Sequence, residues 1–331
     1  MKPKEMWEAF CKEKGIPIET EYDAWAFGST DREADELAQL VLEGKKTATA
    51  SWYDSYVFYK EDLPKKGGYS VVMDSKEEAV CIIENYSVSC EHFCEVSRWH
   101  AYLEGEGDRS LNYWRNVHED FFREEADAIG ERFDDYNKVV LEKFNVVYPD
   151  EYVSHDDILL VEPTFEMADE MDAYRQEFID SGDSMDGTGF RFDEIPAEWV
   201  ERKRRYANPS SVLPDGIVHA TQLMAVRKSD GRLVGTIQIR HELNGYLRDF
   251  AGHIGYSVRR SERRKGYAKK MLSAVLDYCR ALKINEIFVS CIETNEASRR
   301  TILSCGGKYI NTVKETDRGE ILERYVIKEE N

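Results

Sequence analysis

The stretch RRSERRKGYAKKML, residues 259–272, is built to meet an anion. It carries seven cations and one acid in fourteen positions, although the whole chain has a formal net charge of -19. A strand-like run, Ile254 to Val258, precedes it. Apolar residues then recur every three or four positions, which is typical of a helix; they are Met271, Leu272, Val275, Leu276 and Cys279. The stretch is therefore predicted to be a strand-to-helix turn.

Gly266 lies at this turn, where the first N–H groups of the helix lack internal partners and face the positive end of the peptide dipole. A glycine lets a phosphate approach the backbone, and Arg263, Arg264 and Lys265 add positive potential. The spacing thus predicts a phosphate site. A solvated cationic helix start is the alternative reading.

A second candidate for chemistry lies in EGKKTATAS, residues 43–51. A threonine hydroxyl beside a lysine can be activated for attack, and a carboxylate can pass the proton to a departing amine. Lys46 and Thr49 lie in this stretch, and Glu104 joins them only through a resemblance to a known family. The alternatives are a solvated lysine at a helix end, an ordinary strand threonine and a glutamate that caps a turn.

A difference in net charge and a proline-containing segment divide the chain into two halves, each of which must position one set of these residues. Residues 1–154 hold 18 lysines and arginines against 34 acids, whereas residues 155–331 hold 27 against 30. Between the halves, NVVYPDEYVSHDD contains a proline and precedes a new apolar run, so a linker is expected near 148–156. We therefore expect two unlike domains, residues 1–150 and 156–331.

The first half is predicted to be a small β-barrel carrying helices, because short alternating strands follow a helix that ends at Gly44. The second half mixes strands and helices. The chain starts with no secretory signal and contains no membrane-length apolar run, so a cytoplasmic protein without membrane partners is expected. The seven cysteines are odd in number and mostly isolated, which favours reduced thiols, and no metal site is expected.

Arg263-Arg-Lys-Gly266-Tyr267-Ala268 resembles the phosphate-gripping loop of the GNAT acetyltransferases, and the resemblance covers about 170 residues. It implies a splayed mixed central sheet flanked by helices, with acetyl-CoA as cofactor. Tyr256, Ser257 and Val258 would pair with the pantetheine arm, while Asn295 and Ser298, in CIETNEASRRTILSCGG, would face the cofactor.

The sequence indicates the cofactor-binding loop more clearly than the general acid and base of the transfer reaction. The family's usual acid, a tyrosine seven residues after the asparagine, is replaced by Ile302, which leaves Tyr309 or Tyr325 as substitutes. His253 is the favoured base because it titrates near working pH, and Glu242 is the second candidate. A structural histidine is the alternative.

The segments EGKKTATAS and HAYLEGEGDRSLNYWRNVHEDFF resemble the ASCH family, over about residues 24–148. That family has a PUA-like barrel, and some members remove acyl groups from cytidine. The resemblance carries the catalytic trio onto Lys46, Thr49 and Glu104. The acidity of the first half opposes a long nucleic acid, so a nucleoside or nucleotide is easier to accept than RNA.

These readings give one leading function and two alternatives. The leading one is an acetyl-CoA-dependent N-acetyltransferase for a small-molecule or peptide amine, fused to an ASCH domain that binds a nucleoside, nucleotide or RNA. The alternatives are a hydrolase acting on acylated cytidine, and a non-catalytic module that binds nucleic acid and senses acetyl-CoA. The sequence does not decide whether the protein forms a homodimer. The acceptor pocket is expected to be lined by residues that include Met185, Phe190, Phe192, Trp199 and Arg240.

Overall fold

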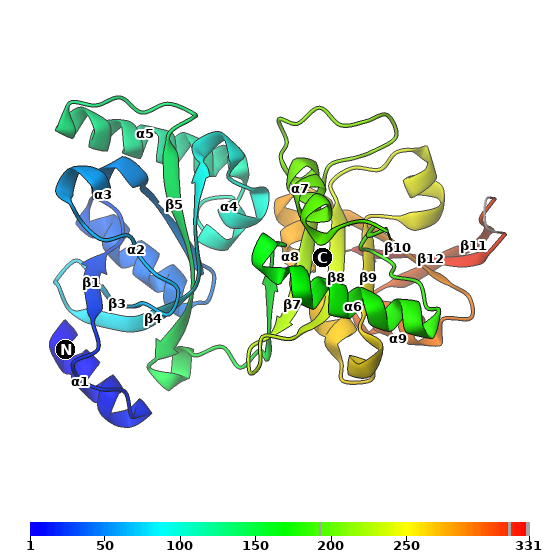
Figure 1. The fold of residues 1–331 in the computed structure, drawn as a ribbon, viewed down its shortest axis with the longest axis horizontal. Helices are drawn as coiled ribbons and strands as arrows, with labels where there is room; N and C mark the ends of the chain where they lie inside the picture. Colours follow the sequence, from blue (N-terminus) through cyan, green and yellow to red (C-terminus); the bar gives the residue numbers. More distant parts are fainter. Residues whose placement is uncertain (192, 317–318, 329–331) are drawn as a thin grey trace. The chain divides into compact units, whose positions relative to one another are not determined.

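The computed structural model describes residues 1–191, 193–316 and 319–328, and the chain divides into two compact units, Met1–His155 and Asp156–Asn331 (Figure 1). Phe192, expected in the acceptor pocket, lies outside the described residues. No helix in the described part of the chain is long and apolar enough to cross a membrane.

The first unit is built on one curled five-stranded sheet. Its strands, in spatial order, are β1 (Tyr22–Ala26), β3 (Tyr69–Met73), β4 (Ala79–His92), β5 (Lys138–Tyr148) and β2 (Ala48–Trp52). Only the β1–β3 pair is parallel. Because β1 and β2 are both edges, the sheet is a half-barrel rather than a closed barrel.

Five helices accompany this sheet: α1 (Pro3–Lys14), α2 (Asp31–Leu42), α3 (Tyr53–Tyr59), α4 (Arg98–Glu104) and α5 (Leu111–Ile129). Side-chain caps fix where the helices around the candidate site begin. Thr30 and Glu33 form a capping box on α2, while Ser97 and Ser110 accept hydrogen bonds from the first turns of α4 and α5.

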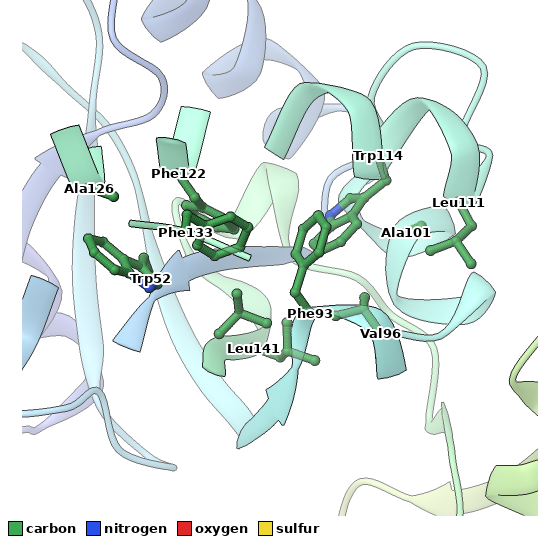
Figure 2. Packing of buried hydrophobic residues seen from close by; sticks show 11 residues of the cluster. Trp52, Phe93, Val96, Ala101, Leu111, Trp114, Phe122, Ala126, Phe133 and Leu141 are labelled. Atoms are coloured by element: carbon green, nitrogen blue, oxygen red, sulfur yellow. The ribbon is translucent and has the colours of Figure 1, made fainter. Parts of the chain in front are cut away.

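An aromatic cluster joins α5 to the sheet (Figure 2). Phe93 stacks on Trp114, with ring centroids 5.2 Å apart, and Phe122 and Phe133 pack against it edge-on or tilted. Aromatic pairs in these geometries add to the stabilisation from burial. The cluster therefore holds Trp114, whose indole N–H serves the candidate site, in a fixed position.

The second unit contains a four-stranded and a three-stranded sheet. The first runs β6 (Ile158–Val161), β7 (Ala220–Arg227), β8 (Leu233–Arg240) and β9 (Ile254–Val258). The second runs β10 (Glu286–Ile292), β12 (Ile321–Lys328) and β11 (Lys308–Lys314). All pairings are antiparallel.

Three helices cover the two faces of the larger sheet, α6 (Ala168–Ser181), α7 (Pro196–Ala207) and α8 (Tyr267–Ala281), while α9 (Glu296–Ser304) packs against α8 and β10. On β7, Met224 packs with residues of α6 and α7, whereas Thr221 bonds to Tyr278 of α8 at 2.7 Å. Positions three apart on a strand point to opposite faces. Helices α6 and α7 therefore lie on one face, with α8 on the other.

The predicted fold class is confirmed: a half-barrel unit with helices, then a unit of strands and helices in which helices flank the central sheet. The described strands of the second unit pair antiparallel rather than in the mixed pattern that the resemblance implies. After Pro163 the chain makes a single 3₁₀ turn, Phe165–Met167, before α6 starts at Ala168.

Candidate functional site

The two sheets of the second unit meet at one point and then diverge. An isolated bridge pairs Gly252 with Val289, and the His253 amide donates to the Phe288 carbonyl at 2.7 Å. Beyond this point β9 pairs only with β8. This separation leaves one long edge of β9 open, beside β10.

The open edge of β9 presents backbone groups at alternate residues. His253 and Arg259 bond to the β8 side through their backbones, at Arg240 and Val234. In an antiparallel pair the outward-facing residues alternate with the paired ones. The N–H and C=O groups of Tyr256 and Val258 therefore point away from β8, as pairing with an extended ligand requires. The Val258 carbonyl accepts from Arg263 Nε at 3.1 Å, so the Tyr256 groups and the Val258 N–H are the ones left for a ligand.

The loop after β9 ends in free amides. Gly266 is the N-cap of α8 and has φ +86, a left-handed value that glycine adopts without strain. A Cβ placed on Gly266 would have no protein atom within 4 Å. The amides of Arg264 to Ala268 make no hydrogen bond with any residue that the structure describes. They therefore form a concentrated set of donors at a helix start.

Buried ion pairs hold this loop in place. Arg259 lies within 2.7 Å of Glu177 and 3.1 Å of Glu170, both on α6, and the Ser261 amide donates to Glu177 at 3.1 Å. Glu262 is buried and accepts from Arg227 at 2.8 Å and from Lys265 at 2.7 Å. The loop is therefore shaped before any ligand arrives.

The loop cations differ in their freedom to meet an anion. Arg263 pairs with Asp183 at 2.8 Å, and Lys265 pairs with Glu262. Arg264 is exposed and has no ion pair with a described residue. The backbone amides and Arg264 therefore supply most of the positive character available to a ligand. Tyr267 is buried, with its hydroxyl 3.4 Å from Arg227.

Asn295 and Ser298 lie at the start of α9, close to the side chain of Tyr256. The Asn295 side chain caps the helix by accepting from the Ser298 amide at 3.1 Å. The Tyr256 hydroxyl lies 2.9 Å from the Ser298 Oγ. Ser257 instead accepts from Tyr174 of α6, at 3.0 Å, so its side chain points away from these residues.

His253 fastens the two sheets together. Its Nδ1 accepts from the Phe288 amide at 3.0 Å, so the proton of the neutral ring lies on Nε2. Burial, followed by the nearby Arg240 charge, lowers its pKa to about 4. Both features weigh against the expected general-base role, because the one free lone pair is already used.

The other expected acids and bases lie apart from this group. Glu242 is exposed and approaches His219 at 3.7 Å. Ile302 is buried in α9, Tyr309 is exposed, and Tyr325 bonds to Glu323 at 2.7 Å. Met185, Phe190 and Trp199, expected in a pocket wall, pack in or against the core beneath α6 and α7, where Phe190 and Trp199 also line a small hollow.

The first unit brings Lys46 and Glu104 together, as the sequence predicts. Glu104 is 1% exposed and accepts from Lys46 at 3.0 Å and from the Trp114 indole at 2.7 Å. His100 lies 3.0 Å away, and Glu106 takes a second bond from Lys46 at 2.6 Å. The result is a buried ionic cluster, Lys46–His100–Glu104–Glu106–Trp114.

Opposing effects set the charges in this cluster. Burial would raise the pKa of Glu104, but Lys46 and then His118 hold that pKa well below its usual range. Burial would lower the pKa of Lys46, but Glu104 and Glu106 raise it. Lys46 is therefore an ammonium, and a free-base role would require the cluster to open.

Thr49 lies on β2, half-buried, opposite Glu142 of β5. Its side chain makes no hydrogen bond with a residue that the structure describes, so no hydrogen bond joins Thr49 to Lys46 or Glu104. Burial raises the pKa of Glu142, whose Oε2 accepts from Asn85 at 2.5 Å.

Sequence reasoning missed two side chains. Tyr256 was identified only for its backbone, and its hydroxyl contact depends on α9, which follows some 40 residues later. Lys203 carries no signal in the sequence, since it reads as one more cation in ERKRR, yet it is buried.

We predict that Glu104→Gln costs about 3–5 kcal/mol of unfolding free energy, because it breaks a buried ion pair. Five of the six tryptophans lie in the first unit, so their fluorescence in urea reports this transition. Glu36→Gln, in the exposed Arg32–Glu36 pair, is the control and should cost less than about 1 kcal/mol.

Since its folded pKa is lowered, Glu104 contributes stability above the ordinary carboxyl pKa. That contribution is lost as the pH falls through the lowered value. The acid part of the stability curve should therefore flatten in Glu104→Gln. Equal costs for the two variants would show that the cluster contributes no more than a surface pair.

Comparison with known proteins matches both units. The model of the ASCH domain matches residues 23–148, and that of the acetyltransferase (GNAT) domain matches residues 172–308. No curated protein matches the chain.

Three solved structures illustrate the likeness. An ASCH domain from Lactobacillus crispatus JV V101 is 33% identical over 44% of this chain and 94% of its own, with a TM-score of 0.43. A microcin C7 self-immunity acetyltransferase in complex with acetyl-CoA and AMP is 19% identical over 52% of this chain and 92% of its own, with a TM-score of 0.42. A putative ribosomal-protein-serine acetyltransferase from Vibrio cholerae is 18% identical over 53% of this chain and 96% of its own, with a TM-score of 0.40. The chain thus contains an ASCH domain over residues 23–148 and a GNAT acetyltransferase domain over residues 172–308.

Proposed function

We propose that the second unit transfers the acetyl group of acetyl-CoA to an amine acceptor. The observation that carries this proposal is the open edge of β9 leading directly into the free amides of Arg264 to Ala268. Diphosphates suit such amides, and an extended amide-containing arm suits a strand edge. Acetyl-CoA contains both groups in that order, and when bound it supplies an activated acetyl thioester.

The residues of this chain would hold the cofactor through its whole length. The loop amides and Arg264 would grip the diphosphate, and the backbone of Tyr256 and Val258 would pair with the pantetheine arm. Asn295, by capping α9, positions Ser298 beside Tyr256.

Tyr256 is the proposed proton donor for the departing thiolate, in the place of the tyrosine that Ile302 replaces. Burial raises the pKa of Tyr256, although the Ser298 hydrogen bond opposes this, so the hydroxyl keeps its proton at neutral pH. Its oxygen is held at 2.9 Å from Ser298 Oγ, and either hydroxyl can be the donor in this pair, so Ser298 can return a proton to Tyr256 after it has donated its own.

Replacing Gly266 should weaken acetyl-CoA binding. In Gly266→Ala, the new Cβ occupies the space over the amides, and we expect an affinity loss of at least about tenfold, or about 1.4 kcal/mol. Calorimetric titration of the full chain measures it. Gly216→Ala is the matched control, since Gly216 also has a left-handed φ, +79, and open space at its Cβ. Equal affinities in the two variants would contradict the assignment of the loop.

Removing the Tyr256 hydroxyl should slow turnover without weakening binding. For Tyr256→Phe we expect kcat for thiol release to fall at least about tenfold, within the usual range for general acids. Tyr174→Phe is the control, because Tyr174 is also a buried tyrosine bonded to a serine hydroxyl. A kcat that stays at the wild-type value in Tyr256→Phe would remove this residue from the mechanism.

A second activity is proposed for the first unit, because Lys46 and Glu104 are in direct contact. The unit would bind a nucleoside, nucleotide or RNA and hydrolyse the acyl amide of an acylated cytidine. Thr49 would attack the acyl carbon while Glu104 takes the hydroxyl proton and passes it to the departing amine, and the charged Lys46 would stabilise the developing oxyanion. Water would then hydrolyse the acyl ester on Thr49 and release acetate. Lys46 must turn from the carboxylates toward the substrate for this to happen.

The test uses Thr49→Val, which removes the hydroxyl while leaving the buried cluster intact. We expect acetate release from acetylated cytidine to fall at least about a hundredfold, as for loss of a nucleophile. Thr47→Val, two residues earlier and also half-buried, should keep the activity. If the wild-type protein releases no acetate at high enzyme concentration, the unit is a binding module only.

A further inference from the structure

Two cations in the second unit lie on either side of one short backbone segment, Gly187–Gly189. Lys203 of α7 is 2% exposed, and its Nζ lies 3.3 Å from the position that a Cβ on Gly189 would take. The ammonium also lies 5.5 Å from the Trp199 ring centroid. Lys203 therefore ends beside this segment, beneath the surface.

Arg240, at the end of β8, approaches the same segment from the β9 side. Its Nη1 donates to the Gly252 carbonyl at 2.9 Å, and its Nη2 lies 3.5 Å from the Cβ position of Gly255. That Cβ position is only 2.9 Å from the Gly187 Cα. Because Gly187 and Gly189 are two residues apart, both cations lie along one stretch of backbone.

The segment itself contributes no polar side chain to the space between the cations. The one side chain that it carries, Thr188, points inward: its Oγ1 donates to the Met185 carbonyl at 2.9 Å and accepts from the Phe190 amide at 3.0 Å. Gly187 is pressed against Gly255, where any Cβ would lie 2.1 Å from a backbone atom.

Neither Lys203 nor Arg240 has a carboxylate within 4.0 Å in the described part of the chain. The nearest acids are engaged elsewhere. Glu194 accepts from Arg202 at 2.9 and 2.6 Å, and the exposed Asp186 accepts from Ser184 at 2.9 Å.

Buried cations are normally paired, because an isolated charge in the interior is costly. Arg259 of the same unit, 4% exposed, follows this rule with two carboxylates. Lys203 departs from it. Burial lowers its pKa well below the usual range, and Arg202 and Arg240 lower it further. A stable fold gains nothing from this arrangement, which indicates a role in binding.

We propose that the acetyl acceptor carries an anionic group, a carboxylate or a phosphate, and that Lys203 and Arg240 bind it. This proposal rests on the proposed transferase function. Arg240 lies beside Gly255 of β9, one residue from Tyr256, so an acceptor anchored here by its anion directs its amine toward the open edge of that strand. Charge-assisted bonds to both cations would supply the missing counter-charge.

Anion binding to the full-length protein, saturated with acetyl-CoA, tests the proposal directly. Saturation fills the loop, so that added inorganic phosphate or acetate cannot bind there. We expect calorimetry to detect binding of at least one of them, and the stronger of the two identifies the anionic group. In Lys203→Met the affinity should fall at least about tenfold. Lys228→Met, an exposed lysine in the same unit, makes the same change in net charge and should leave the affinity unchanged.

Lys203→Met should fold, since it replaces a buried charge with an apolar side chain of similar length; thermal melting checks this. If the wild-type protein binds neither anion, or if Lys203→Met binds as tightly as the wild type, the proposal is overturned while the transferase function stands. If acetyl-CoA does not bind, the transferase function fails instead, and the comparison of the two variants still decides whether the anion site exists.

A matched pair of acceptors gives a second readout. O-phosphoethanolamine is compared with ethanolamine, and an amino acid with its amide, by the rate of thiol release. The wild type should prefer the anionic member of one pair, and Lys203→Met should lose that preference. A preference that survives in Lys203→Met would contradict the site.

Discussion

One junction, between β9 and β10, determines what the second unit can bind. The two strands are joined by the Gly252–Val289 bridge and by two hydrogen bonds between His253 and Phe288, and they part immediately afterwards. If the pairing continued, Tyr256 and Val258 would spend their outward groups on β10. A histidine that stays neutral suits this role, because a protonated ring could not accept the Phe288 amide. The junction is thus a structural device, and it creates an unpaired edge without leaving polar groups buried and unsatisfied.

In the loop that follows β9, too, contacts within the protein decide which backbone groups stay unpaired. Side chains satisfy one another through Glu177, Arg259 and Glu262, so the backbone amides of Arg264 to Ala268 are left for a ligand. Rigid side-chain contacts around free backbone donors are what preorganisation requires, since little freedom remains to be lost on binding. It also follows that most of the positive charge apparent in RRSERRKGYAKKML is neutralised within the protein. The anion site depends on oriented amides more than on net charge.

The sequence predicted the parts of the molecule that depend on local patterns. Helix periodicity after Gly266 and the turn itself placed the loop correctly, and the alternating strands gave the fold class. The Lys46–Glu104 contact came through the family resemblance. Tertiary contacts decided the rest. The sequence predicts that His253 is a titratable base. In the structure the Phe288 amide, 35 residues later, donates a hydrogen bond to the free lone pair of its ring. Lys203 is indistinguishable from its neighbours in ERKRR until α7 is packed against the Gly187–Gly189 segment.

The two buried lysines show how the same residue type serves stability in one unit and binding in the other. Lys46 meets two carboxylates, and its pKa is raised; Lys203 meets none, and its pKa is lowered. Both have lost their water, so the difference lies only in whether the chain supplies the counter-charge. Where the chain supplies the counter-charge, as for Lys46, the ion pair stabilises the fold, and the lysine must leave its carboxylates before it can contact a substrate. Where it does not, burial still disfavours the charged form, and an arriving anion supplies the counter-charge that favours it.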